Sequence, residues 1–324
     1  MRHDTAVVVA PRDRHSPAPR ILQAIFDNVP AGTPVLYADP GSRGRVRRQL
    51  NRMSATRGLH VFTLPPGTPG NAARNAALAH VTAKYVAFVE NDTLVTGDWL
   101  TTLVAAAQRT GAAMVVPLLL QHEGDIQKVH AAGGEMRIVD DGGRRRLDTR
   151  PIDCGAAPDA CRYAAGPVEA GEMHCLLIER EALLAVGGFD ERVAPTYDHV
   201  DLSLSLRAAG YAIHLEPAAR AVYLPPPPLT VGDIGHFRFQ WSAARHEAGI
   251  ARLEQKWDVA CDYPAARIVE RRIRLAADGL VLWAGAPLRP LLPLRVRRGI
   301  SRVLRGMLQP VTVLARRLSE LRRT

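Results

Sequence analysis

The chain has 324 residues, of which 47% are hydrophobic, and it carries a formal net charge of +10. This length suits one large α/β domain with an appendage, and no uncharged apolar run reaches the roughly 18 residues needed to span a bilayer. The positive charge is concentrated in residues 265–324, which hold fourteen arginines and three acidic residues. The nearly neutral remainder argues against a nucleic-acid-binding protein, which usually carries its charge on the folded binding face.

The cysteines and the N-terminus indicate a compartment. The four cysteines have neither zinc-site spacing nor the density of a disulfide scaffold, which favours a reducing environment. The first residues lead directly into a strand-like run, without the apolar region and cleavage site of a signal peptide. We therefore expect a cytoplasmic protein.

Strand-like and helix-like segments alternate through the first 120 residues. Apolar runs typical of buried strands occupy residues 5–10, 34–38, 59–64, 85–89 and 113–120, and helical patterns occupy 19–28, 45–56, 70–81 and 98–109. This rhythm predicts βαβ units, and hence a mostly parallel sheet with right-handed crossovers.

Residues 121–165 break the rhythm. They are rich in Gly, Asp and Arg, which predicts a hairpin followed by a mobile loop. The expected elements then resume as strands at 173–178 and 211–215 and helices at 179–186, 198–209, 236–257 and 265–283, followed by two basic amphipathic helices near 296–307 and 311–323. The proline run at 225–228 suggests two regions, 1–230 and 231–324.

The most informative segment is Glu90-Asn91-Asp92, which directly follows the apolar run Tyr85–Val89. Two carboxylates one residue apart project to the same side of an extended chain. In open α/β sheets, ligands bind at the carboxyl ends of the strands. Such a pair could hold a divalent cation, and the cation could hold a diphosphate; a solvated acidic turn is the alternative.

Several motifs, in their order and spacing, make residues 5–225 resemble family 2 glycosyltransferases of the GT-A fold. They are Asp39-Pro40-Gly41-Ser42, Gly70-Asn71-Ala72-Ala73-Arg74-Asn75, Glu90-Asn91-Asp92, Gly187-Gly188-Phe189-Asp190-Glu191 and Asp198-His199-Val200-Asp201. The glycine-rich fourth motif followed closely by an acidic helix start is the most specific combination. The resemblance implies an α/β fold: a Rossmann-like three-layer domain for nucleotide-diphospho-sugar transfer, with a C-terminal helical extension.

The resemblance also implies a donor site. Asp39 is expected to accept a hydrogen bond from the donor's base, and Arg74 to meet the base or the diphosphate. Asp92 is expected to bind Mg²⁺ or Mn²⁺, with Glu90 as a further metal ligand or a contact of the ribose or sugar. The competing interpretations are a simple turn at Asp39 and a surface position for Arg74.

Two further histidines, His174 and His236, are candidates for the site under this resemblance. Some GT-A enzymes recruit a histidine near the end of the domain as a third metal ligand. Tyr223 occupies about that place in this chain, which leaves His236 as the candidate ligand. His174 either lines the acceptor side of the site or is a core histidine.

The helix start at Asp198, His199 and Asp201 is expected to supply the catalytic base. An inverting transfer needs a group that takes the proton of the acceptor hydroxyl. The family often has Glu-Asp-x-Asp here with the second acid as base, and in this chain His199 stands in that second position. Either His199 or Asp198 serves, and the helix dipole is expected to keep His199 neutral. An N-cap role for Asp198, with Asp201 in the first turn, is the alternative.

These expectations describe a metal-dependent, inverting glycosyltransferase of hexosyltransferase type. It would use a UDP-, GDP- or dTDP-sugar and a glycan, lipid-linked or small-molecule acceptor. The rival is a catalytically inactive GT-A module that binds a glycan or protein partner, because Glu90 and His199 replace the expected acids. The arginine-rich tail, interleaved with Leu, Val and Ile, predicts peripheral binding to the anionic inner face of the plasma membrane, and no nucleic acid.

Overall fold

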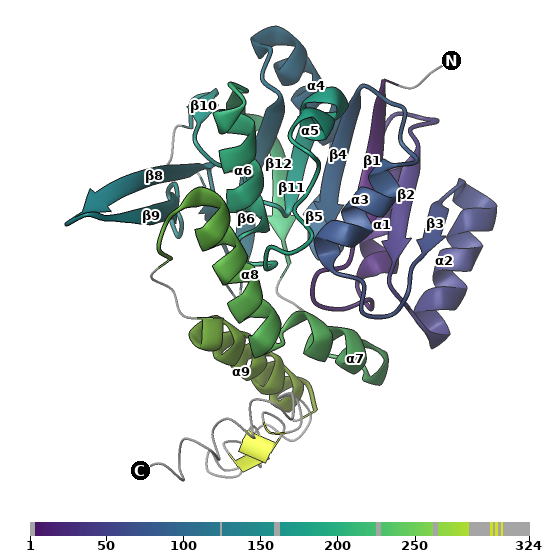
Figure 1. Ribbon diagram of the computed structural model, residues 1–324. Helices are drawn as coiled ribbons and strands as arrows, with labels where there is room; N and C mark the ends of the chain where they lie inside the picture. Colours follow the sequence, from purple (N-terminus) through teal and green to yellow (C-terminus); the bar gives the residue numbers. More distant parts are fainter. Residues whose placement is uncertain are drawn as a thin grey trace, which may run out of the picture.

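The computed structural model describes residues 4–123, 125–158, 163–224, 228–261 and 265–284, together with residues 299, 300, 302, 303 and 306. Within these residues a ten-stranded sheet has the order β10-β12-β6-β11-β4-β1-β2-β3, with β5 paired to β12 and β7 to β6 (Figure 1). The strands are β1 (Thr5–Ala10), β2 (Val35–Asp39), β3 (His60–Thr63), β4 (Tyr85–Glu90), β5 (Thr93–Val95), β6 (Met114–Glu123), β7 (Ile126–Ala131), β10 (Gly166–Val168), β11 (Cys175–Glu179) and β12 (Ile213–Tyr223).

The sheet is mixed, so the prediction of a mostly parallel sheet is wrong for one half of it. Strands β3, β2, β1 and β4 are parallel neighbours, as the alternation of strands and helices predicts. Strand β11 then runs antiparallel between β4 and β6. An apolar run is the same whichever way a strand points, so the sequence pattern did not reveal this reversal.

Helices cover both faces of the sheet and give the predicted three layers. One core contains residues of α1 (Ala18–Asp27), α2 (Gly44–Arg57) and α4 (Trp99–Thr110). The other contains residues of α3 (Gly70–Leu78), α5 (Arg180–Ala185) and α6 (Asp198–Ala208). In α1 the buried residues Ala18, Ile21, Leu22 and Ile25 follow the spacing of one helix face, which explains why this segment packs as a helix.

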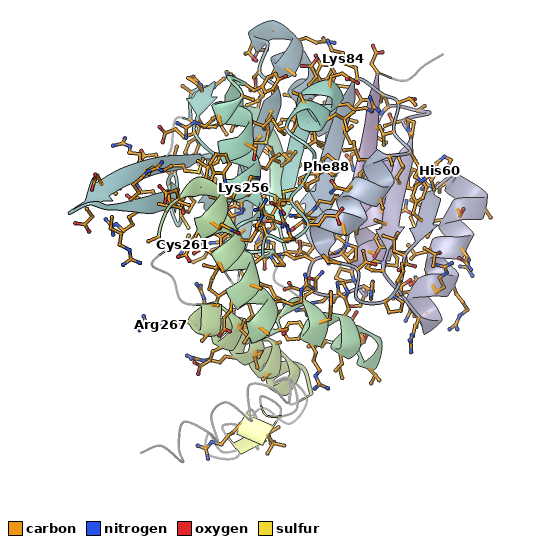
Figure 2. The ribbon with its side chains drawn as sticks, in the orientation of Figure 1. His60, Lys84, Phe88, Lys256, Cys261 and Arg267 are labelled. Carbon is orange, nitrogen blue, oxygen red and sulfur yellow. The ribbon has the colours of Figure 1, made fainter. Side chains whose placement is uncertain are left out.

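The glycine-rich motif at 187–191 joins α5 to the loop before α6. Gly188 has a φ of 74°, and a Cβ there would lie 2.9 Å from Asn75 Oδ1, so only glycine suits this turn. Phe189 is 3% exposed and packs edge-on, with ring centroids 4.9 Å apart, against Phe88 of β4, which is labelled in Figure 2. The motif therefore anchors the chain before α6 to the core.

The predicted hairpin is present as β8 (Gly134–Asp141) and β9 (Arg144–Pro151), which project beside the sheet (Figure 1). Asp141 pairs with Arg144, so Gly142 and Gly143 form a two-residue turn. Both glycines have positive φ, which is the geometry that two-residue hairpins require.

Three helices follow β12: α7 (Val231–Gln240) and α9 (Ala265–Ala284) lie below the sheet in Figure 1, and α8 (Ala243–Trp257) runs upward from α7 toward the hairpin. The single helix expected at 236–257 is two helices that meet at Trp241. The first begins earlier than predicted, at a capping box formed by Thr230 and Asp233. In α8, a Cβ on Gly249 would lie 2.3 Å from the backbone nitrogen of Ala194, so glycine allows this helix to approach the loop before α6.

The predicted tail helices at 296–307 and 311–323 lie outside the described residues, apart from residues 299, 300, 302, 303 and 306. Ile300 and Val303 are 42% and 58% exposed. Among the helices that the structure describes, none is both long and apolar enough to cross a membrane.

Candidate active site

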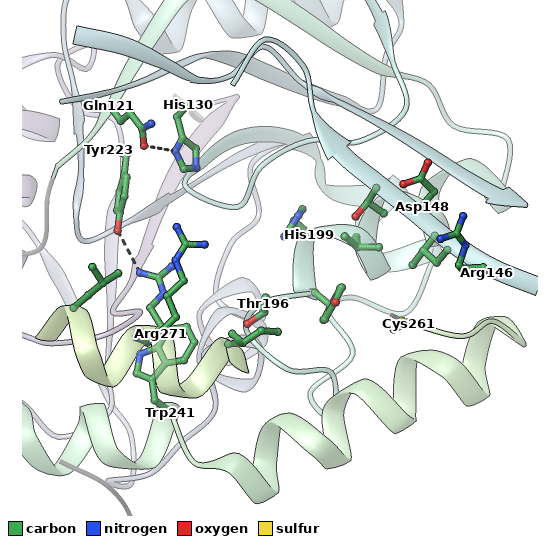
Figure 3. Close-up of a pocket in the computed structure, with 17 residues that line it drawn as sticks. Gln121, His130, Arg146, Asp148, Thr196, His199, Tyr223, Trp241, Cys261 and Arg271 are labelled. Atoms are coloured by element: carbon green, nitrogen blue, oxygen red, sulfur yellow. Dashed lines mark hydrogen bonds between the residues drawn. The ribbon is translucent and has the colours of Figure 1, made fainter. Parts of the chain in front are cut away.

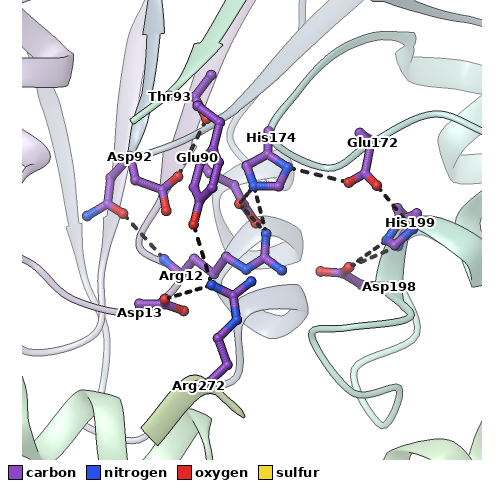
Figure 4. Close-up of polar contacts among 12 residues, drawn as sticks. Arg12, Asp13, Glu90, Asp92, Thr93, Glu172, His174, Asp198, His199 and Arg272 are labelled. Atoms are coloured by element: carbon purple, nitrogen blue, oxygen red, sulfur yellow. Dashed lines mark hydrogen bonds and ion pairs between the residues drawn. The ribbon is translucent and has the colours of Figure 1, made fainter. Parts of the chain in front are cut away.

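The candidate site lies at the carboxyl ends of β1 and β4. These strands pair in parallel up to Ala10 and Glu90, so the loop after β1 lies beside Glu90-Asn91-Asp92. Asn91 fixes that loop, because its side-chain amide donates to the carbonyl of Arg14 at 2.7 Å. His174 precedes β11, and its carbonyl accepts from the Glu90 nitrogen at 3.0 Å. Three segments distant in sequence thus bring their polar side chains together (Figure 4).

Glu90 is held between two arginines. Arg12 Nη1 lies 2.9 Å from Glu90 Oε2, and Arg74 Nη2 lies 3.0 Å from Glu90 Oε1. The Glu90 side chain is only 3% exposed. A carboxylate this buried is stabilised as an anion by such charge-assisted hydrogen bonds. Each carboxylate oxygen of Glu90 is therefore paired with an arginine side chain.

Asp92 has a different environment. It is 3% exposed, and the one hydrogen bond described for its carboxylate comes from Thr93 Oγ1 at 3.5 Å. Burial and the nearby charge of Glu90 raise the pKa of Asp92 to about 6. A buried carboxylate with so few donors is costly unless a cation compensates for it. Asp92 therefore has the character of a metal ligand.

His174 rather than His236 lies beside these carboxylates. Ligand atoms of Glu90, Asp92 and His174 lie within 4.8 Å of one another, a group that could hold a metal ion. His236, the ligand expected from the sequence, packs instead against His15 with ring centroids 4.5 Å apart. Its place on α7 puts it beneath the loop after β1, and it belongs to neither metal-binding group found among the described residues. Among the described residues, His236 therefore does not lie with the group that could hold a metal.

A second group that could hold a metal contains His130, Glu172 and His174. His130 Nδ1 lies 2.8 Å from Gln121 Oε1, and burial together with His174 lowers the pKa of His130 to about 4. His174 belongs to both groups, with Nε2 3.7 Å from Glu90 and Nδ1 3.4 Å from Glu172. It is therefore a central residue of the site and not simply a core histidine.

Asp39 ends β2 and is fully buried. Its carboxylate accepts from the nitrogen and hydroxyl of Ser42 at 2.7 and 2.6 Å, and from Arg47 Nη1 at 2.7 Å. This is the turn foreseen as the competing interpretation. A donor base would have to share Asp39 with these groups.

Arg74 is buried on α3, so the surface alternative is wrong for this residue. Besides Glu90, its guanidinium contacts Asn71 Oδ1 at 2.7 Å and Asp198 Oδ2 at 3.0 Å. Arg74 therefore connects the strand end at Glu90 with the first residue of α6.

The N-terminus of α6 brings Asp198 and His199 to the same region. Asp198 Oδ1 accepts from the His199 nitrogen at 2.9 Å and lies 3.6 Å from His199 Nδ1. His199 Nε2 lies 3.7 Å from Glu172 Oε1. Burial lowers the pKa of His199, but the attraction of Glu172 and the contact with Asp198 outweigh it, and the pKa is raised. The pKa of His199 is therefore shifted in the direction opposite to the one expected from the helix dipole, because the two carboxylates favour the charged ring.

Asp201 makes contacts of a different kind. Lys256 Nζ lies 2.9 Å from Asp201 Oδ2, and Trp257 Nε1 donates to Oδ1 at 2.8 Å. Both donors belong to α8, so Asp201 joins α6 to the C-terminal helices. The structure does not bring it together with Asp198 and His199 as a catalytic group.

A cavity of about 630 Å³ opens beside His199 (Figure 3). The hairpin, the start of α6, the end of β12 and α9 all contribute to its walls. Its polar lining includes His130, Asp148, His199, Tyr223 and Arg272. By contrast, the space lined by Arg12, Arg74 and Asp198 measures only about 10 Å³. The cavity is large enough to hold a sugar next to the candidate base.

No sequence motif marked four further residues of the site, Arg12, Glu172, His130 and Arg272. Arg272 Nη1 lies 3.6 Å from Asp13 Oδ2 and 3.4 Å from the Tyr223 hydroxyl, which ties α9 to the site. One signal was available, because Arg12 directly follows a buried strand and Pro11. The other residues come from the irregular segment after residue 120 and from a C-terminal helix, where no motif marks them.

Comparisons with known proteins place part of the chain beside a described family. Residues 8–162 match the family model described as Glycosyl transferase family 2. An uncharacterized protein, y4gI, of Sinorhizobium fredii (strain NBRC 101917 / NGR234) is 34% identical over 144 residues, which are 44% of this chain and 15% of y4gI. The succinoglycan biosynthesis protein ExoM of Rhizobium meliloti (strain 1021) is 44% identical over 52 residues, 16% of this chain and 17% of ExoM. The chain thus spans less than a fifth of either relative.

The fold also resembles a solved structure. A crystal structure of GalNAc-T7 with UDP, GalNAc and Mn²⁺ superposes with a TM-score of 0.53 at 15% identity. The match covers 78% of this chain and 51% of GalNAc-T7. At this identity the likeness concerns the fold, which is the GT-A fold of glycosyltransferases.

Proposed function

Because the chain carries a glycosyl transferase family 2 domain with a GT-A fold, we propose that it transfers a sugar from a nucleotide-sugar donor to an acceptor hydroxyl. We place the boundary between the catalytic domain and the helical C-terminal region after residue 230. Metal dependence and inversion of the anomeric centre are part of this proposal.

The observation that carries the proposal is the environment of Asp92. This carboxylate is buried at the carboxyl end of β4, has few donors, and has a pKa raised to about 6 by burial and by Glu90. Such a group is poised for a cation. The position is also where open α/β sheets bind ligands.

The donor set fits Mg²⁺ or Mn²⁺. Asp92 would be the main ligand, with His174 and Glu90 beside it, and an oxygen-rich set with one imidazole suits Mn²⁺ in particular. When bound, the ion would neutralise charge on the departing nucleoside diphosphate. Asp39 would meet the donor's base, and Arg74 the base or the diphosphate.

Asp198 and His199 support the acid–base part of the proposal. Both stand at the start of α6, and His199 lines the larger cavity. One of them would take the proton of the acceptor hydroxyl as its oxygen attacks the sugar. We propose that the acceptor, whether glycan, lipid-linked or small molecule, enters through this cavity.

The test uses Asp92→Asn and a panel of UDP, GDP and dTDP. We expect calorimetry to detect Mn²⁺-dependent binding of one nucleotide to the unmodified protein and none to the variant. Asp27→Asn, at an exposed position on α1, is the matched control. Equal nucleotide affinity in the unmodified protein and Asp92→Asn would refute the metal assignment.

The rival is a GT-A module that binds without catalysis. The observation in its favour is the closed donor side, where Asp39, Arg74, Glu90 and Asp92 are all at most 4% exposed. Metal-dependent hydrolysis of a nucleotide-sugar, measured as release of nucleoside diphosphate, separates the two. If the protein binds the nucleotide but hydrolyses no nucleotide-sugar, the result supports the non-catalytic GT-A module.

A further inference from the structure

We propose that the guanidinium of Arg12 is a built-in counter-ion that occupies the metal position in the metal-free protein and withdraws when the divalent cation binds. The inference rests on the proposed function, since it takes Glu90, Asp92 and His174 as the metal site. It assigns to Arg12 a positioning role in metal and donor binding.

The proposal starts from the position of Arg12 Nη1. Arg12 Nη1 lies 2.9 Å from Glu90 Oε2 and 3.0 Å from His174 Nε2 (Figure 4). Together with Asp92, these two residues form one of the two described groups whose ligand atoms could share a metal. A cation bound at about 2 Å needs the same lone pairs that Arg12 now contacts. The metal and the guanidinium therefore compete for Glu90 and His174.

The charges around Arg12 explain why it rests there. Its side chain is 11% exposed and lies among acidic groups, because Asp13 follows it directly and Glu90 is in contact. Burial opposes the charged form, but Glu90, Asp13 and Asp92 outweigh it and keep the pKa of Arg12 high. Without such a cation, a buried cluster of carboxylates would repel itself.

Arrival of a divalent cation reverses this balance. Glu90 already accepts from Arg74 at 3.0 Å, so a metal ion and two guanidinium groups would crowd one carboxylate with positive charge. A nucleoside diphosphate that arrives with the metal offers Arg12 new oxygen acceptors. We therefore expect Mn²⁺ alone to bind weakly and Mn²⁺ with a nucleoside diphosphate to bind tightly, because Arg12 couples the two events.

The experiment compares Mn²⁺ affinity without nucleotide, by calorimetry and electron paramagnetic resonance, in the unmodified protein and two variants. Arg12→Gln should bind Mn²⁺ at least about tenfold more tightly, because a competing cation is gone. Arg109→Gln is the control: it removes the same charge from an ion pair with Glu216, which belongs to neither group that could hold a metal. Its Mn²⁺ affinity should match that of the unmodified protein. Equal gains in both variants, or no gain in Arg12→Gln, would overturn the proposal.

A second measurement uses only the unmodified protein, so it does not depend on whether the variants fold. Crystals of the unmodified protein with MnCl₂ should show an anomalous peak among Glu90, Asp92 and His174, and Arg12 should have left them. A peak there with the Arg12 contacts retained refutes the inference.

The binding data also separate this inference from the proposed function. If Asp92→Asn abolishes Mn²⁺ binding while Arg12→Gln leaves it unchanged, the inference alone is wrong. If Asp92→Asn binds Mn²⁺ as well as the unmodified protein, the metal site itself is wrong and the inference falls with it.

Discussion

His199 Nε2 lies 3.7 Å from Glu172 Oε1, so the first turn of α6 is connected to the segment that leads into β11. The other oxygen of Glu172 lies 3.4 Å from His174 Nδ1. One carboxylate thus bridges the candidate base and the candidate metal ligand. A metal-bound histidine commonly gives its second ring N–H to such a carboxylate, which fixes its orientation.

Glu172→Gln should lower the pKa of His199. The carboxylate of Glu172 favours the imidazolium, and a neutral amide does not. The measurement is an NMR titration of the histidine ring protons. Glu181→Gln, on the exposed side of α5, is the control and should leave the His199 titration unchanged. An unchanged pKa in Glu172→Gln would mean that Glu172 does not hold this ring.

If His199 is the base, His199→Ala should lower turnover by about 10²–10⁴ with little change in donor affinity. A base acts in its neutral form, and the pKa of His199 is raised above 6.5. Activity should therefore rise with pH through a midpoint above 6.5. Release of nucleoside diphosphate against pH measures this.

If Asp198 is the base instead, Asp198→Asn should lower turnover by about 10²–10⁴. Burial raises the pKa of Asp198, but His199 and Arg74 outweigh it and the pKa is lowered, so activity would extend to lower pH. Near-normal turnover in both single variants would place the base elsewhere.

The sequence predicted most of the elements, and the position of Glu90 and Asp92 at the end of a buried strand, for a definite physical reason. A buried strand that ends in Glu90-Asn91-Asp92 must place its acidic residues at the ligand-binding edge of the sheet, whatever the rest of the chain does. The role of Phe189 in the core follows similarly from the glycine turn before it. Local pattern was sufficient in these places.

Local pattern was insufficient where tertiary contacts decide. His174 became a central residue because β11 runs antiparallel beside β4, a pairing that no local signal encodes. Asp201 and His199 both looked like catalytic groups at one helix start. Their different roles depend on tertiary contacts. Asp201 contacts Lys256 of α8, whereas His199 lies near Glu172 in the segment before β11.

Asp201→Asn should destabilise the protein by about 1–3 kcal/mol and leave nucleotide affinity unchanged. The Asp201 side chain is 5% exposed and accepts from both Lys256 and Trp257, so the amide would lose an ion pair between α6 and α8. Urea unfolding gives the stability, and calorimetry gives the affinity. A turnover loss of about a hundredfold or more with unchanged stability would instead support the catalytic role expected from the sequence.

The arginine-rich tail should bind anionic membranes. The arginines near residues 295–305 alternate with apolar residues, of which Ile300 and Val303 are exposed. Anionic headgroups attract each such arginine by about 1 kcal/mol near the surface. Sedimentation with phosphatidylserine liposomes should show binding by the full chain and little by a truncation after Ala284, which keeps α9, and zwitterionic liposomes are the control. Equal binding by the truncation would refute the prediction.

Buried His246 should make the free energy of unfolding fall in mild acid. This residue of α8 is fully buried and stacks on Trp241, with ring centroids 5.0 Å apart. Burial lowers the pKa of His246 from 6.5 to about 4. Because the unfolded chain takes up this proton more readily, the free energy of unfolding falls as the pH drops from 6.5 towards 4, by up to about 3 kcal/mol.

His246→Gln cannot titrate and should therefore lose this part of the pH dependence. Urea unfolding of both proteins at pH 7 and pH 4.5 measures the difference. We expect the unmodified protein to lose more stability than the variant between these two values. His60→Gln, at an exposed position on β3, controls for histidines in general and should keep the steeper dependence. If His246→Gln has the same pH dependence as the unmodified protein, the buried ring is not what acid acts on, and another group in the C-terminal helices must carry the effect.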